Sequence, residues 1–469
     1  MNRPIPDPGS FRDPNGRIYH CGGKVYRTIT ARARDDFEFV RGTGLIERLV
    51  GDGRVIASEM VLPSSHPGVF DDNIAHVVEH PRLPFISYPY EWPFPALKAA
   101  ALLHLGIQID ALDAGVALSD ASAFNIQFRG ARPIFIDLLS FRRHQDGEMW
   151  AGHRQFCEQF LNPLLLRAKC GVAHNAWYRG TQEGITAGDL RRLLPWTSKL
   201  SRNILLHVVA QSAFQKAPMA PGTDGKALLK TRFPTASYRR MLTSLRGWIE
   251  TLEPADTGKT IWQDYAKSHS YADDEITAKQ DFIAEFAQAV TPELMWDLGC
   301  NTGDFSAVAL GNGAKYAIGF DMDQGALEQA FARAAAADLP FTPLYLDGAN
   351  PSPSQGWNER ERQGLAGRAN ADAVIALAFV HHLAIGRNIP LPDLAAWLTG
   401  LAPHGVVEFV PKQDPMVQRL LALREDIFPD YTVAHFQHCL SQGAEIIEAR
   451  TVTQSGRTLI RFRRLETGR

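Results

Sequence analysis

Hydrophobic and polar positions alternate with two different periods along the second half of the chain. Short apolar runs, typical of buried strands, are separated by stretches in which apolar residues recur every three or four positions, as on an amphipathic helix. The predicted strands lie at residues 295–299, 317–321, 342–347, 373–380, 406–410, 445–454 and 458–464. This alternation predicts an α/β domain with a doubly wound, seven-stranded, Rossmann-like sheet that ends in an antiparallel hairpin.

The first two predicted strands enclose a glycine-rich turn. Gly299 and Gly303 let the backbone turn sharply and come close to a ligand. Asp321 ends the second strand, where a carboxylate can accept hydrogen bonds from both hydroxyls of a ribose. Asp297 and Asp304 flank the turn and would repel a pyrophosphate. The pattern therefore favours a nucleoside cofactor with a cationic centre and an amino-acid tail, and an NAD-type or empty Rossmann fold is the alternative.

The amino-acid sequence of the turn indicates one particular cofactor. D-L-G-C-N-T-G at residues 297–303 resembles motif I of class I S-adenosylmethionine-dependent methyltransferases, and G-F-D-M-D at residues 319–323 resembles their motif II. The resemblance implies S-adenosyl-L-methionine as the cofactor, with Asp321 on its ribose and Met322 against its adenine. The residues that match motif I, and would surround the amino-acid tail and the sulfonium, are Asp297, Gly299, Asn301, Thr302 and Gly303.

Two further segments match cofactor-binding positions of these methyltransferases. Asp347, followed by Gly348 in L-D-G-A-N, resembles the residue that accepts the adenine amino group. A helix cap or a turn hydrogen bond is the alternative for this aspartate. Tyr265 and Tyr271 match an aromatic lead-in, W-x-x-Y-A-x-x-x-x-Y, that lies over the cofactor in many methyltransferases. Buried packing is the alternative for both tyrosines.

Candidate catalytic side chains follow the fourth and fifth predicted strands. His381 and His382 come directly after the fourth strand, where the methyl acceptor is expected, and an imidazole can act as a base near neutral pH. A structural role is the alternative for a histidine. Glu408 lies inside an apolar strand, where an unpaired charge is costly, so it either orients a substrate or base or forms a salt bridge. Lys412 either meets an anionic acceptor or is solvated.

The N-terminal half contains a different constellation. Asp120 lies on a predicted loop, Asn125 follows it, and Asp137 closes the second strand of a small hairpin. In phosphoryl transfer the first aspartate can orient a hydroxyl, while the asparagine and the second aspartate hold magnesium on the nucleotide phosphates. The segment resembles the catalytic loop and metal-binding aspartate of the kinase-like fold, especially its small-molecule branch. Ordinary turn hydrogen bonds of Asp120 and Asn125 are the alternative.

The resemblance to kinases is incomplete. Asp120 is not preceded by His-Arg or His-Gly, no G-x-G-x-x-G loop comes before it, and D-L-L stands in place of D-F-G at Asp137. Lys24 and Arg27 are the candidates for the lysine that kinases carry on a strand. We therefore predict a degenerate, kinase-like α+β domain over residues 1–214, with Asn125 and Asp137 as its only metal-binding candidates.

Length and composition agree with several domains in one cytoplasmic chain. The 469 residues exceed one ordinary domain, and we predict a linker and basic helix at 215–260 and the methyltransferase domain at 261–469. The net charge of −2 favours neither a nucleic acid nor an anionic membrane. An odd number of scattered cysteines without C-x-x-C indicates a reducing compartment and no zinc site. The polar N-terminus and the absence of a long apolar run indicate neither a signal peptide nor a membrane span.

These patterns predict an S-adenosylmethionine-dependent methyltransferase that acts on a small molecule or a saccharide. No aromatic-basic run indicates a nucleic-acid partner, and no pattern indicates an oligomeric state. The order of the parts is also similar to that of a bacterial methyltransferase group that includes the NoeA-type nodulation proteins. A bifunctional kinase and methyltransferase, and a cofactor-binding module without turnover, are the two alternatives.

Overall fold

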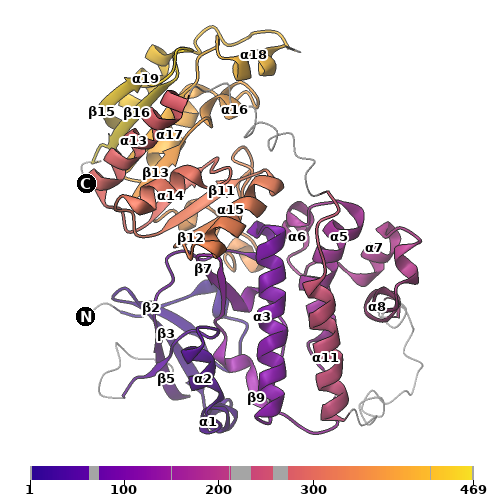
Figure 1. Cartoon of the computed structure of the whole chain (residues 1–469). Helices are drawn as coiled ribbons and strands as arrows, with labels where there is room; N and C mark the ends of the chain where they lie inside the picture. Colours follow the sequence, from indigo (N-terminus) through magenta and orange to yellow (C-terminus); the bar gives the residue numbers. More distant parts are fainter. Residues whose placement is uncertain are drawn as a thin grey trace. The chain divides into compact units, whose positions relative to one another are not determined.

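The structure is a computed structural model, which describes residues 3–62, 73–148, 150–210, 212, 234–256, 273–422 and 424–466. The chain forms two compact units (Figure 1). Unit 1 contains Met1–Phe128, Arg132–Thr257 and Gln355–Arg362, and unit 2 contains Arg129–Ala131, Gly258–Ser354 and Gln363–Arg469. Tyr265 and Tyr271, which were predicted to lie over the cofactor, are outside the described residues.

Unit 2 is built on a seven-stranded sheet with the order β12-β11-β10-β13-β14-β16-β15. Its strands are β10 (Met295–Leu298), β11 (Ala317–Asp321), β12 (Phe341–Tyr345), β13 (Ala373–Ala376), β14 (His404–Phe409), β15 (Ala444–Thr451) and β16 (Thr458–Arg464). The first five pair in parallel, and the last two form an antiparallel hairpin beside β14. The sheet grows outward from β10 in both directions, so the predicted doubly wound α/β sheet is confirmed.

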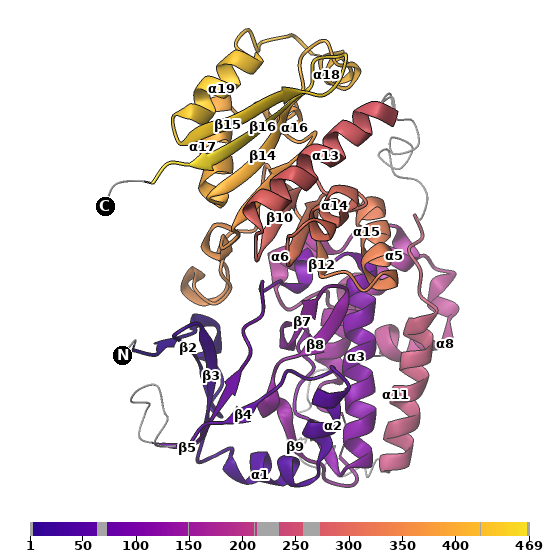
Figure 2. The same ribbon diagram turned by 60° about the vertical axis from the view of Figure 1, so that its left-hand side comes forward.

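Helices precede and connect the strands of this sheet (Figure 2). They are α13 (Asp273–Val290), α14 (Asp304–Gly311), α15 (Gln324–Ala336), α16 (Val380–Ala384), α17 (Leu391–Leu401), α18 (Pro415–Leu421) and α19 (Val433–Ser441). The central strands are buried on both faces, and the Trp296 and Phe320 rings meet edge to face with centroids 5.2 Å apart. Because the carboxyl ends of parallel strands lie at one edge of the sheet, the loops after β10, β11 and β13 converge there.

The fourth predicted strand was too long. It was predicted over residues 373–380, but β13 ends at Ala376 and α16 begins at Val380. The apolar run continues through a turn in which Leu377 is buried and the half-buried Ala378 has a φ of +48°. Hydrophobicity alone does not distinguish a buried strand from the apolar turn that follows it. The correction places Phe379 and His381 in a turn and a helix at the edge of the sheet.

Unit 1 combines an antiparallel sheet with a group of helices. The five-stranded sheet has the order β1-β2-β3-β5-β4, made of β1 (Ile5–Pro6), β2 (Ile18–Cys21), β3 (Lys24–Thr30), β5 (Ile74–His80) and β4 (Glu59–Met60). Two small pairs follow, β6 (Val116–Leu118) with β9 (Phe141–Arg143) and β7 (Ile126–Arg129) with β8 (Arg132–Phe135). The predicted α+β character of this half is confirmed, and its relation to the kinase-like fold stays a prediction.

The helices of unit 1 include a long buried one, α3 (Phe94–Asp113), against which α11 packs. The others are α1 (Arg34–Gly42), α2 (Leu45–Gly51), α4 (His153–Phe156), α5 (Asn162–Cys170), α6 (Asn175–Thr181), α7 (Ala187–Leu193), α8 (Arg202–Ile204) and α11 (Thr235–Glu250), with π-helical turns η6 (Cys157–Leu161) and η8 (Leu205–Ala210). In the described part of the chain, none of the helices has the length and hydropathy needed to cross a membrane.

Candidate functional site

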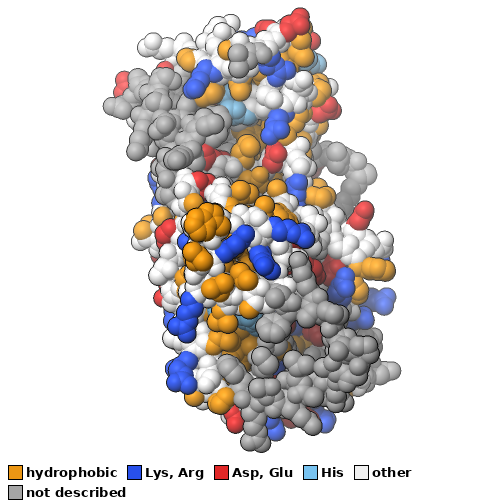
Figure 3. Space-filling model, turned by 90° about the vertical axis from the view of Figure 1, so that its right-hand side faces the viewer, with side chains coloured by type: hydrophobic (Ala, Val, Ile, Leu, Met, Phe, Trp, Pro, Cys, Tyr) orange, Lys and Arg blue, Asp and Glu red, His pale blue; other side chains and the backbone are white. Residues whose placement is uncertain are grey.

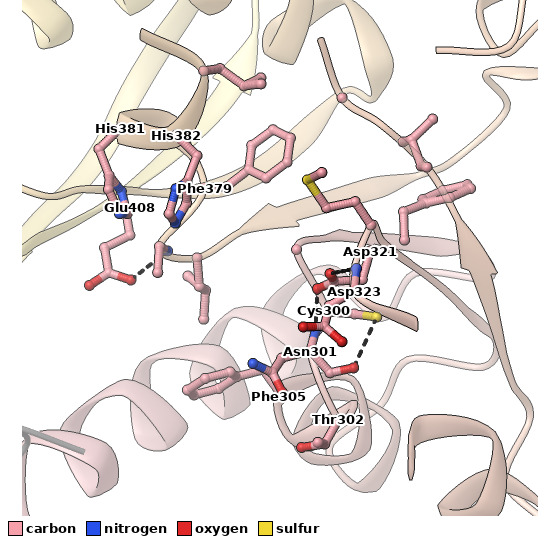
Figure 4. A pocket seen from close by; sticks show the side chains of 18 of the residues that line it. Cys300, Asn301, Thr302, Phe305, Asp321, Asp323, Phe379, His381, His382 and Glu408 are labelled. Atoms are coloured by element: carbon pink, nitrogen blue, oxygen red, sulfur yellow. Dashed lines mark hydrogen bonds between the residues drawn. The ribbon is translucent and has the colours of Figure 1, made fainter. Parts of the chain in front are cut away.

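A cavity of about 600 Å³ lies at the carboxyl ends of β10, β11 and β13 in unit 2. Helix α13 and the end of β14 complete its wall. Most of the residues predicted to bind the cofactor or the acceptor line this cavity (Figure 4). They are Gly299, Asn301, Thr302, Asp321, Met322, Asp347, Gly348, His381, His382 and Glu408. The fold thus brings together side chains that are separated by up to about a hundred residues in sequence.

The glycine-rich turn owes its shape to three residues with positive φ. Gly299, Asn301 and Gly303 have φ of 77°, 49° and 79°. Gly303 is the residue before α14, and a Cβ there would lie 2.5 Å from the ring of Phe341. Gly303 does not line the cavity, so glycine is needed at this position for the turn and for its packing rather than for contact with a ligand.

Gly303→Ala is expected to lower the free energy of unfolding of unit 2 by about 2 kcal/mol, because the new Cβ combines an unfavourable φ with a clash against Phe341. Denaturant unfolding measures the loss. Gly311→Ala is the matched control, since Gly311 is the last residue of α14 and a Cβ there meets no atom of the described residues within 4 Å. That control should be neutral or stabilising by up to about 1 kcal/mol. Equal effects of the two substitutions would contradict the explanation.

The carboxylate of Asp321 is held at the floor of the cavity by two backbone hydrogen bonds. The backbone N of Asn301 donates to Oδ2 at 2.9 Å, and the backbone N of Asp323 donates to Oδ1 at 2.8 Å. Burial raises the pKa of Asp321 even though both hydrogen bonds favour its charged form. A carboxylate offers about four acceptor positions, so two remain for hydroxyl donors in the cavity. Met322, next along the chain, is 50% exposed beside it.

Asp297 lies below the turn and does not line the cavity. Its side chain accepts a hydrogen bond of 2.6 Å from Oγ of Ser306 and is only 2% exposed. Burial raises its pKa to about 7, and the nearby charges of Asp321 and Asp304 add to the rise. The structure thus separates two acids that were both predicted to bind the cofactor. Asp321 faces the cavity, whereas Asp297 stabilises the start of α14.

Asp347 forms the turn hydrogen bond that was one of its two predicted roles, and its binding to adenine stays a prediction. Its Oδ1 accepts a hydrogen bond of 3.0 Å from the backbone N of Ala349, which is the turn contact, and its side chain also lines the cavity. Arg387 lies 3.7 Å from Oδ2. A Cβ on the adjacent Gly348 would approach the ring of Phe379 to 2.7 Å, so glycine leaves room for this ring in the cavity wall.

His381 and His382 lie side by side in α16, with ring centroids 4.1 Å apart. His381 is 1% exposed, and within the described residues neither of its ring nitrogens has a hydrogen-bond partner. Burial lowers the pKa of His382 to about 4 and that of His381 well below the ordinary histidine value, with further lowering of the latter by His382 and Lys279. Both imidazoles are therefore neutral near pH 7 and can accept protons only as weak bases.

The imidazole NMR signals of His381 and His382 are expected to stay constant as the pH falls from about 8 to about 5.5, because both rings remain neutral above their lowered pKa values. A short histidine-containing peptide, whose free imidazole has a pKa of about 6.5, serves as the reference. Movement of the His382 signal with a midpoint near that of an ordinary histidine would refute the prediction.

Glu408 forms the salt bridge that was one of its two predicted roles. Its side chain is 0% exposed; Nζ of Lys279 lies 2.6 Å from Oε1, and the backbone N of Ala378 donates to Oε2 at 2.8 Å. Arg457 lies 3.6 Å from Oε1 and is held by Asp414 at 2.7 Å. This buried network neutralises Glu408 at the edge of the cavity. Lys412, by contrast, pairs with Asp426.

Sequence reasoning missed Lys279 and Phe379, which both line the cavity. Lys279 shares one apolar face of α13 with Ile276 and Ile283, and a lysine at that helical spacing was a signal for a buried partner. The ring of Phe379 stacks on Trp397, with centroids 6.2 Å apart. Sequence reasoning missed Phe379 because the fourth strand was predicted to extend over it, to residue 380.

The predicted kinase-like residues also lie together, in unit 1. Oγ of Ser140 lies within hydrogen-bond distance of both Asp120 and Asp137, and Nδ2 of Asn125 donates to Asp120 at 3.2 Å. Burial and the charge of Asp137 raise the pKa of Asp120 to about 6. Arg27 lies 2.7 Å from Asp137 and supplies its countercharge. Magnesium binding by Asn125 and Asp137 stays a prediction, and Arg27 already pairs with Oδ1 of Asp137.

Comparison with known proteins extends these observations. No protein-family model matches the chain. Among solved structures, it is similar to the N-methyltransferase NodS from Bradyrhizobium japonicum WM9, with 12% identity over 41% of this chain and 98% of that chain and a TM-score of 0.31. It is also similar to magnesium protoporphyrin IX methyltransferase (ChlM) from Synechocystis PCC 6803 with bound SAH, with 17% identity over 44% and 93% of the two chains and a TM-score of 0.31.

A relative from Rhizobium meliloti (strain 1021), nodulation protein NoeA, matches nearly the whole chain. The two sequences are 47% identical over 463 residues, which cover 98% of this chain and 96% of the relative. The alignment therefore includes both units. On this identity, the chain belongs to the family of the nodulation protein NoeA.

Proposed function

We propose that unit 2 is an S-adenosyl-L-methionine-dependent methyltransferase domain. The observation that carries the proposal is the position of Asp321, whose carboxylate is anchored by two backbone amides and faces a cavity of about 600 Å³ beside the turn that resembles motif I. An acid held in this way at the end of the second strand suits the two hydroxyls of a ribose. The same turn places Asn301 and Thr302 beside it for the amino-acid tail.

The remaining walls fit the rest of this cofactor. Met322 and Phe379 offer apolar surfaces for an adenine ring, and Asp347 offers an acceptor for its amino group. The bound cofactor would supply a methyl group on a cationic sulfur, which loses its charge as the methyl leaves. The protein then has to align the acceptor and exclude water. Ile276, Phe305 and Leu383 contribute the apolar lining that does so.

We propose a small molecule or a saccharide as the acceptor. Among the described residues of the cavity wall, the lysine and the arginine that could meet an anion already have partners, Lys279 with Glu408 and Arg387 with Asp347. Lysine and arginine side chains on the face shown in Figure 3 lie among hydrophobic and acidic ones, which does not favour a nucleic acid. His382, the more accessible of the two histidines, would take the proton that the acceptor loses during transfer.

The location we propose is the cytoplasm, because none of the five cysteines forms a disulfide bond. A reducing compartment keeps cysteine thiols in their reduced form.

Calorimetric titration of the purified chain with S-adenosyl-L-methionine and with S-adenosylhomocysteine tests the proposal. We expect saturable binding of both. Incubation with a donor that carries a labelled methyl group, together with fractionated extract, should then transfer the label to one fraction and form S-adenosylhomocysteine. Absence of donor binding would reject the methyltransferase. Binding without product in any fraction would instead favour a module that holds the cofactor without turnover.

A further inference from the structure

Two histidines and one cysteine that have no role in the sites described above converge inside unit 1. His153 lies in α4, Cys157 begins the π-helical turn η6, and His207 lies in the π-helical turn η8. Nε2 of His153 is 3.1 Å from Nδ1 of His207 and 3.7 Å from Sγ of Cys157. All three atoms lie within 4.8 Å of one another. We propose that His153, Cys157 and His207 form a binding site for one zinc-like divalent cation.

The distances match the ligand shell of such an ion. Zinc binds histidine nitrogen at about 2.0–2.1 Å and cysteine sulfur at about 2.3 Å in a tetrahedral arrangement. Tetrahedral angles then place two nitrogens about 3.3 Å apart and a nitrogen about 3.6 Å from the sulfur. The separations of 3.1 Å and 3.7 Å are close to these values. The cluster therefore needs only small movements to enclose the ion, and water can take the fourth position.

The chemistry of the three side chains selects the metal. A thiolate with two imidazoles suits borderline-soft ions such as zinc, whereas magnesium and calcium prefer oxygen ligands. A neutral imidazole carries one nitrogen lone pair, so each of the two rings can offer one nitrogen to the ion. Binding would displace the proton shared between the two rings to another ring nitrogen and release the thiol proton of Cys157. One proton therefore leaves for each cation bound.

The local structure presents these side chains together. Spacing of four residues places His153 and Cys157 on one face of the helix. The wider π-helical turn begins at Cys157, where the carbonyl of Glu158 accepts a hydrogen bond of 2.8 Å from the backbone N of Ile185. Such turns are rare and occur often at functional sites. Here both π-helical turns of unit 1 carry one ligand each, among the residues that the structure describes.

Aromatic rings enclose the cluster. The Trp150 ring lies 5.5 Å from that of His153, and the Trp248 ring stacks on His207 at 6.1 Å between centroids. A cation held there would tie α4, η8 and, through Trp248, helix α11 to one another. The spacing of the cysteines did not indicate this site, because the site contains only one cysteine and its second histidine lies fifty residues further along the chain.

Cobalt titration of the full-length, reduced and metal-free chain tests the proposal. We expect one Co²⁺ per chain, with thiolate-to-cobalt charge-transfer absorption that zinc abolishes on displacement. Cys157→Ser should remove this absorption and weaken binding by at least about tenfold. His207→Gln should weaken binding to a similar extent but retain the absorption at saturating cobalt, because the sulfur remains.

Cys439→Ser provides the matched control. Cys439 is also buried and also lies four residues from a histidine, with Nε2 of His435 at 3.6 Å from Sγ, but among the described residues no second imidazole completes a three-ligand group there. Its substitution should leave cobalt binding unchanged. Circular dichroism and the unfolding transition of each variant establish that it is folded. Failure of the wild-type chain to bind cobalt or zinc, or charge-transfer absorption that persists in folded Cys157→Ser, would overturn the proposal.

Discussion

Asp321→Ala is expected to weaken the binding of S-adenosyl-L-methionine by at least about 100-fold. A hydrogen bond between a hydroxyl and a charged carboxylate contributes about 1.5–3 kcal/mol, and the two remaining acceptor positions of Asp321 would serve two ribose hydroxyls. Loss of both therefore amounts to about 3 kcal/mol or more, with about 1.4 kcal/mol for each tenfold change in affinity. Calorimetric titration of the variant and the wild-type chain measures the difference.

Two controls separate loss of binding from loss of the fold. Asp393→Ala removes an acid from the first turn of α17, outside the cavity, and should leave the affinity unchanged. Asp321→Asn retains one carbonyl acceptor for the backbone amides of Asn301 and Asp323, so it should remain folded even if the alanine variant does not. Unchanged affinity in either folded variant of Asp321 would contradict the assignment of this residue to the ribose.

Lys279→Met is expected to lower the free energy of unfolding of unit 2 by about 3 kcal/mol. The substitution removes the cation 2.6 Å from Glu408 and leaves a carboxylate with no exposed surface. Removing one partner of a buried ion pair typically costs 3–5 kcal/mol, and the low end applies because Arg457 remains 3.6 Å away. In thermal unfolding this loss corresponds to a decrease in Tm of about 6–12 °C for a unit of this size.

The same substitution at an exposed ion pair is the matched control. Lys412 pairs with Asp426 at 2.7 Å near the surface of unit 2, and Lys412→Met should change the stability by less than about 1 kcal/mol. The double variant Lys279→Met, Glu408→Gln should be more stable than Lys279→Met alone, because no buried charge is left without its partner. Equal losses at Lys279 and Lys412 would show that burial of the pair has no special importance.

Local features of the sequence were sufficient to predict the strands of unit 2 and the glycine-rich turn between the first two of them. The strands that carry Asp297 and Asp321 are short apolar runs, and such periodicity depends only on neighbouring residues. Gly299 and Gly303 adopt the positive φ that their residue type permits. Once parallel strands are predicted, their carboxyl ends must meet, so the cavity beside Asp321 and His382 followed from the order of elements.

Local features failed where one apolar run contained two structures. The run from Ala373 to Val380 continues from a strand into a turn, and its residues are apolar in both. The chain changes direction there because Ala378 adopts a positive φ and its backbone N donates to Glu408 from the neighbouring strand. A hydrogen bond to a residue thirty positions away cannot be recognised from the hydrophobic pattern of neighbouring residues.

The amino-acid sequence by itself determined the doubly wound sheet, the glycine-rich turn and the acid at the end of β11, because each follows from the properties of adjacent residues. Only the tertiary structure decided that Asp297 is buried below the turn while Asp321 faces the cavity, and that Lys279 neutralises Glu408. It also decided that His207 meets His153. These outcomes depend on packing between distant segments, where burial and the nearest opposite charge determine the ionisation and the role of each side chain.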